Sequence, residues 1–205
     1  MPEEVYNPLD KLRLGESVAK ALLARPLLSL PPSEAFSGAG VYAIYYSGSF
    51  PAYGLVAERN RNDRWEGPIY VGKAVPLGAR KGGYALGEAP GEVLFRRLRE
   101  HAESIEQAEN LDPRDFRCRY LVVDDIWIPL GEALLIAMFF PLWSHQIEGF
   151  GIHDPGRGRY NQQRSPWDTI HPGRPWAARL QPNTRTVEEI LRTAEAFLLR
   201  SGKSS

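Results

Sequence analysis

Five polar side chains, far apart along the chain, could together cleave a phosphate ester. Tyr42 and Tyr70 lie in the short motifs Gly-Val-Tyr and Tyr-Val-Gly. Arg97 and His101 are four residues apart, which on a helix places both on one face. A guanidinium can hold a phosphate oxygen with two donors, and an imidazole can transfer a proton near neutral pH. Glu132 could complete such a site with a carboxylate.

Glu132 stands at the start of an apolar stretch, because residues 133–140 carry no charge. A carboxylate is costly to desolvate beside such a stretch unless a cation meets it. Mg²⁺ is a suitable cation, since it often uses only one or two carboxylates together with water and phosphate. Alternatively, Glu132 could lie in the first turn of a helix, where the helix dipole favours a negative charge. The five residues together predict a metal-dependent nuclease.

The other four residues also have plain structural explanations. Tyrosines in strands usually pack in a core, and a phenol with a pKa near 10 is a poor base at neutral pH. Arg97 and His101 border an apolar helical stripe, so they could simply extend from the core edge into water. Lys73 follows the second motif and could contact phosphate or end a strand.

Hydrophobic periodicity and chain breakers predict the elements that position these residues. Runs rich in β-branched and aromatic residues predict strands, and apolar residues at helical spacing predict helices. Long segments containing Gly, Pro, Asn and Asp interrupt them. The expected strands span residues 41–46, 68–73 and 116–123, the helices span 16–23, 92–108, 130–140 and 186–199, and irregular segments span 47–67, 77–91 and 143–182.

Composition bounds the class of protein. A chain of 205 residues with 43% hydrophobic content can form one core, and a single cysteine, Cys118, excludes an intrachain disulfide and suits a reducing cytoplasm. No signal-peptide or membrane-spanning stretch is evident. Lysine plus arginine equals aspartate plus glutamate at 25 each, but basic residues gather in 73–99 and 153–179. Candidate nucleic-acid contacts are Lys73, Arg80, Lys81, Arg157, Arg159 and Arg174.

Two other kinds of site are not indicated. The solitary Cys118 and scattered histidines do not match a zinc-binding spacing. The segment GARKGG lacks the final Lys-Ser/Thr of a nucleotide-binding loop, so no nucleotide cofactor is expected.

The order of these motifs resembles the GIY-YIG endonuclease superfamily, and within it the type II restriction endonucleases. The resemblance covers roughly residues 29–177 and includes SLPPSEAFSGAGVYAIYYSG, PIYVGKAVPLG, RRLREHAESI, NLDPRDFRCRYLV, EALLIAMFFPLW and WDTIHPGRPWA. It implies an α/β (α+β) fold in which helices flank a three-stranded antiparallel sheet. It also implies Mg²⁺-dependent hydrolysis of double-stranded DNA at specific sites, with 5′-phosphate and 3′-hydroxyl ends.

The resemblance assigns a role to each of the five residues. Tyr42 would lie beside the attacking water as a base or relay, and Tyr70 would support the phosphate. Arg97 would neutralise charge on the scissile phosphate, His101 would orient or deprotonate the Tyr42 and water pair, and Glu132 would hold the single divalent cation. Family members often carry an asparagine shortly after the glutamate helix, where this chain has Ser144, so Ser144 is a further candidate.

The expected organisation is one globular domain. It comprises an N-terminal arm (1–37), a nuclease core (38–145) with an insertion (47–67), and a loop-rich C-terminal extension (146–205). A homodimer is expected, because two-fold symmetry suits the cutting of two strands. Two alternatives are a repair or homing nuclease, for which little room remains for a separate DNA-binding domain, and a non-catalytic nucleic-acid-binding module of the same fold.

Overall fold

The computed structural model describes residues 10–76 and 91–201. An antiparallel sheet forms its centre, with strands in the order β1-β4-β2-β3. The strands are β1 (Leu28–Ser29), β2 (Gly40–Tyr46), β3 (Pro68–Ala74) and β4 (Phe116–Val122). The expected three strands are therefore present, and the two-residue β1 adds a fourth beside β4. The mixed α/β architecture agrees with the predicted fold class.

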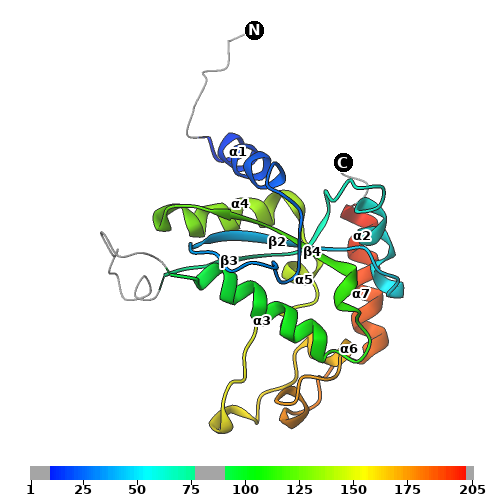
Figure 1. Ribbon diagram of the computed structural model, residues 1–205. Helices are drawn as coiled ribbons and strands as arrows, with labels where there is room; N and C mark the ends of the chain where they lie inside the picture. Colours follow the sequence, from blue (N-terminus) through cyan, green and yellow to red (C-terminus); the bar gives the residue numbers. More distant parts are fainter. Residues whose placement is uncertain (1–9, 77–90, 202–205) are drawn as a thin grey trace.

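Helices cover both faces of the sheet (Figure 1). The α-helices are α1 (Lys11–Leu23), α2 (Gly54–Arg59), α3 (Val93–Gln107), α4 (Ile128–Phe139), α5 (Leu142–His145), α6 (Pro166–Ile170) and α7 (Val187–Ser201). Short 3₁₀ turns are η1 (Pro51–Tyr53), η3 (Pro113–Asp115), η4 (Asp125–Trp127), η5 (Arg157–Arg159) and η6 (Ala177–Arg179). None of the helices in the described part of the chain is long and apolar enough to cross a membrane.

The central strand β2 separates two apolar clusters, because successive side chains of a strand point to opposite faces. Tyr42 and Ile44 pack with α3 on one face, while Val41 and Ala43 pack on the face covered by α1 and α4. With both faces covered, every residue of β2 is buried. This position places the first tyrosine motif under α3, and the pairing of Tyr42 with Gly72 of β3 brings the second motif beside it.

Residues 10–37 are part of the folded body. Helix α1 begins earlier than expected, with the Asp10 side chain accepting hydrogen bonds from the backbone nitrogens of Leu12 and Arg13. It packs on α4, where Gly15 allows close contact with Met138. Helix α4 is apolar on nearly all sides; α1 and the sheet bury Ile128 and Leu135, whereas Met138 is 37% exposed.

The insertion and the C-terminal extension pack together. Residues 47–67 contain η1 and α2, which contact α7. A chain of hydrogen bonds reinforces this contact: the buried Tyr53 hydroxyl lies 2.6 Å from Nε2 of the buried His171, whose Nδ1 lies 2.8 Å from Oδ1 of Asn110. Three segments distant in sequence are thus joined beside the end of α3.

Candidate active site

Tyr42 and His101 form a buried pair between β2 and α3. The Tyr42 hydroxyl oxygen lies 2.6 Å from Nε2 of His101, and the two residues are 0% and 1% exposed. Burial raises the pKa of Tyr42 well above its ordinary value. Burial, together with the positive charge of Arg97, lowers the pKa of His101 well below 6.5. Both groups are therefore neutral near pH 7, joined by a hydrogen bond along which a proton can move.

The second motif contributes the Tyr70 ring and, at Gly72, room for the Tyr42 hydroxyl. The Tyr70 ring packs edge-on against His101, with 5.1 Å between ring centroids, and lies 6.2 Å from the Tyr42 ring. A Cβ at Gly72 would lie 2.5 Å from the Tyr42 hydroxyl oxygen, so only glycine fits beneath that hydroxyl. The glycine of Tyr-Val-Gly is thus required by the tyrosine of Gly-Val-Tyr.

Arg97 projects from α3 beside the pair and is held by three acceptors. Its Nη1 donates to Oε2 of Glu100 over 2.9 Å and to Nε2 of His153, and its Nη2 donates to the Gly151 carbonyl over 2.7 Å. Burial raises the pKa of Tyr70, and the charge of Arg97 opposes that rise. The guanidinium is therefore the positive charge available to a phenolate or a phosphate at this point.

Glu132 is the fifth residue of α4 and lies past its first turn, so the helix dipole does not account for it. One of its carboxylate oxygens, Oε2, accepts a hydrogen bond from Nζ of Lys73 over 2.6 Å, at the outer strand β3. Its negative charge contributes to raising the pKa values of both Tyr42 and Tyr70, although less than burial does. Glu132 therefore interacts electrostatically with the tyrosine pair and already has a cation beside it, the Lys73 ammonium.

The donor set suits a hard divalent cation held by few protein ligands. Among residues 10–76 and 91–201 there is no group of three or more His, Cys, Asp or Glu that could hold a metal. A cation at Glu132 would thus rely on that carboxylate together with water and substrate oxygens, which is the coordination Mg²⁺ commonly accepts. It would share the carboxylate with, or replace, the Lys73 ammonium.

Ser144 contacts a strand edge. Its hydroxyl lies 3.5 Å from the backbone nitrogen and 3.4 Å from the carbonyl oxygen of Val71. Because β3 is the outermost strand, α5 here satisfies backbone groups that no further strand pairs. The hydrogen bonds are long, which indicates a weak structural contact.

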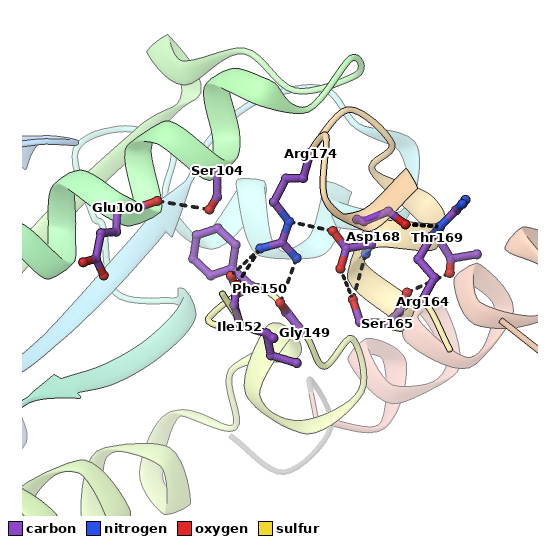
Figure 2. A network of polar contacts seen from close by, with 11 residues as sticks. Glu100, Ser104, Gly149, Phe150, Ile152, Arg164, Ser165, Asp168, Thr169 and Arg174 are labelled. Carbon is purple, nitrogen blue, oxygen red and sulfur yellow. Dashed lines mark hydrogen bonds and ion pairs between the residues drawn. The ribbon is translucent and has the colours of Figure 1, made fainter. Parts of the chain in front are cut away.

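The predicted nucleic-acid contacts fall into four groups. Arg157 and Arg159 are exposed in η5, and Lys73 is paired with Glu132. Arg80 and Lys81 lie outside the described residues. Arg174 departs from the prediction: it is 2% exposed, and its guanidinium donates to Asp168 and to three backbone carbonyls (Figure 2). In this conformation Arg174 is a buried structural residue and cannot contact DNA.

Sequence reasoning missed one segment of the site. Residues 149–153 lie along the side chains of the predicted site: the Phe150 ring stacks on His101, with 4.5 Å between centroids and 17° between planes. Gly151 and His153 both accept from Arg97. This segment lies in an irregular, glycine-rich region that has no periodicity, so no sequence signal connected it to α3.

A pocket of about 320 Å³ opens beside this segment, next to α3 and the C-terminal loop. Its lining includes Glu100, Glu103 and Asp154. The lining also includes Arg174 and Arg179, so acidic and basic side chains are mixed there.

Comparison with known proteins identifies the sequence. A family model described as the Eco29kI GIY-YIG domain matches residues 34–198, which include every residue of the predicted site. No curated protein matches the chain.

Proposed function

The chain belongs to the Eco29kI GIY-YIG family of type II restriction endonucleases, and we propose that Tyr42, Arg97 and Glu132 lie at the centre of its active site. Membership implies a deoxyribonuclease that binds DNA. The observation that carries the assignment of the site is the buried hydrogen bond between Tyr42 and His101, with Arg97 beside it. Three signature residues from two elements meet there.

Tyr42 and His101 act as a proton relay. The pKa of Tyr42 is raised, so its hydroxyl does not act as a base by losing its proton to bulk water. Instead, the attacking water gives a proton to the Tyr42 oxygen while the Tyr42 proton passes to Nε2 of His101. The pKa of His101 is low in the free protein, and the negative charge of a bound phosphate would raise it toward the neutral range. In this structure the hydroxyl is enclosed, so water must reach it when DNA binds.

Arg97 stabilises charge on the phosphate. Its present acceptors are the Glu100 carboxylate, the Gly151 carbonyl and the His153 imidazole, and a phosphate oxygen would take the place of the carboxylate beside the guanidinium. A positively charged donor fixed where charge develops contributes to transition-state stabilisation. Tyr70 would support the phosphate from the facing strand.

Glu132 is the carboxylate proposed to hold one Mg²⁺. Such an ion supplies Lewis-acid stabilisation and orients the phosphate. Lys73, which now neutralises Glu132, would be released to contact a neighbouring phosphate oxygen. Water attacks in line and leaves 5′-phosphate and 3′-hydroxyl ends.

DNA contacts outside the catalytic residues are assigned to the exposed Arg157 and Arg159, together with Arg80 and Lys81. A homodimer would give each DNA strand one active site, as two-fold symmetry allows.

The test is cleavage of plasmid DNA with Mg²⁺ and with EDTA. Discrete fragments that form with Mg²⁺, disappear with EDTA and religate without added kinase support the assignment. A smear, or cutting confined to damaged DNA, would indicate a repair-type nuclease. Retardation of the DNA without cleavage would contradict catalysis altogether.

A further inference from the structure

Residues 149–153, here called the strap, contact three members of the proposed site. Phe150 stacks on the imidazole of His101 and meets the Tyr70 ring edge-on at 5.0 Å. The Gly151 carbonyl accepts from Arg97, and a Cβ at Gly151 would lie 2.7 Å from the Tyr70 hydroxyl oxygen and 3.1 Å from Nη2 of Arg97. The strap therefore sets the plane of one catalytic ring and one edge of the guanidinium.

Arg174 anchors the backbone of the strap (Figure 2). Arg174 donates to the carbonyls of Gly149, Phe150 and Ile152 over 2.9 to 3.1 Å. Its Nε donates to Oδ1 of Asp168 over 2.6 Å, and both side chains of this ion pair are 1% exposed. Four donor–acceptor contacts from one rigid fork leave the strap backbone little freedom.

The hydrogen bonds of Arg174 to the strap and to Asp168, here called the clamp, lie in rigid surroundings. The guanidinium carbon of Arg174 lies 4.6 Å from the ring centroids of both Trp167 and Trp176. Asp168 is itself fixed, because its Oδ2 accepts a hydrogen bond from the Ser165 hydroxyl and its backbone nitrogen donates to Oγ of Ser165. Segments that open and close have few buried contacts, whereas this one is held by a buried ion pair between aromatic rings.

We propose that Arg174 is a positioning residue of the nuclease reaction: through the strap, it fixes His101 and Arg97 in the orientation needed for catalysis. This inference rests on the proposed function of those two residues. It differs from the expected role in DNA contact, because Arg174 is only 2% exposed. Its hydrogen bonds act on the site through the strap, and its positive charge also contributes to lowering the pKa of His101.

The experiment compares two variants that disturb the strap from opposite sides. Arg174→Gln removes the clamp, and Gly151→Ala places a methyl group against Tyr70 and Arg97 while leaving the clamp intact. The second variant is needed because losing one partner of a buried ion pair is strongly destabilising. Arg164→Gln is the matched control, since its Nε also donates to a backbone carbonyl of the extension, that of Ala177, away from the strap.

The measurements are the single-turnover cleavage rate with Mg²⁺ and the Kd for the same DNA in EDTA, at a temperature where each variant is folded. Gly151→Ala and Arg174→Gln should each lose about 10²-fold in rate, as misplacement of catalytic groups does, while the Kd changes less than about threefold. Arg164→Gln should retain the wild-type rate. In the double variant the two losses should not add, because both act through the strap.

Several outcomes would overturn the inference. Wild-type rates in both folded variants would remove the strap from catalysis, and faster cleavage would make it an obstruction. A loss of rate matched by weaker binding would make Arg174 a determinant of DNA affinity. Arg97→Ala is measured alongside to separate failure of the proposed function from failure of this inference. Normal cleavage by Arg97→Ala would refute the assignment of the site. Slow cleavage by Arg97→Ala together with normal cleavage by Arg174→Gln would refute only the role of Arg174.

Discussion

The hydroxyl oxygen of Tyr42 lies 2.6 Å from Nε2 of His101, although the residues belong to a central strand and to the helix that covers it. Both side chains are buried, and this burial, which raises the pKa of Tyr42 and lowers that of His101, keeps both neutral. A neutral phenol bonded to a neutral imidazole can accept one proton and release another. This geometry gives a specific chemical meaning to the first tyrosine motif.

Tyr42→Phe should slow single-turnover cleavage by about 10²- to 10⁴-fold, the range typical of lost general acid–base catalysis. Affinity for DNA in EDTA should be preserved, because Tyr42 is enclosed. Tyr120→Phe is the control, since Tyr120 lies opposite Tyr42 on β4 but stacks on Phe36. Equal rates for the two variants would exclude a relay through Tyr42.

Arg97→Ala should lower the single-turnover rate by about 10²- to 10³-fold, as removal of one electrostatic donor to a transition state does. The Glu100 and His153 groups that now accept from Arg97 would remain on the surface side of α3 and can be hydrated. Arg99→Ala is a suitable control, because Arg99 is exposed on the same helix and pairs with Glu103. A near-normal rate for Arg97→Ala would remove that residue from the site.

Stability should fall as the pH is lowered below 6.5. Burial lowers the pKa of His171 to about 3, and that of His101 is also depressed, so between pH 6.5 and about 3 the unfolded chain binds protons that the folded chain rejects. Each such histidine can contribute a slope of up to about 1.4 kcal/mol per pH unit. Urea unfolding at pH 7 and pH 5 should show a smaller loss for His171→Gln than for wild type. His145→Gln, at an exposed position, should behave as wild type. If His171→Gln lost as much stability as wild type between pH 7 and pH 5, the lowered pKa of His171 would be contradicted.

Ser144→Ala should cost less than about 1 kcal/mol of stability and leave the cleavage rate within a few fold of wild type. The reason is that the Ser144 hydroxyl meets Val71 only at 3.4 to 3.5 Å, on the strand edge. Thermal unfolding and single-turnover rates check both parts. A loss as large as that expected for Arg97→Ala would place Ser144 in the catalytic machinery.

Much of the fold was predictable because its elements have strong local signals. The aromatic and β-branched runs around Tyr42 and Tyr70 indicated strands, and the spacing of Leu94, Leu98 and Ile105 indicated α3. The two-residue strand β1 has no such signal, since it depends on pairing with β4. Structure within residues 47–67 was also missed, because α2 is short and flanked by residues that favour turns.

The site was predictable where residues share one element and less so where elements meet. Spacing alone placed Arg97 and His101 on one face, whereas the pairing of Lys73 with Glu132 depends on how α4 crosses the sheet edge. Arg174 was misread because an arginine in a Gly- and Pro-rich segment is normally exposed. The tryptophans on either side of it, Trp167 and Trp176, were the available sign of burial.

The central claim is that the proposed catalytic side chains surround one phosphodiester, with a divalent cation held at Glu132. Its most direct test is the Mg²⁺-dependent single-turnover cleavage rate of Glu132→Gln, with the bound fraction of DNA measured in EDTA. We predict a loss on the order of 10³-fold, since several kcal/mol of metal-derived stabilisation disappear, with binding largely retained. Cleavage by Glu132→Gln at the wild-type rate, with the same dependence on Mg²⁺, would contradict the account.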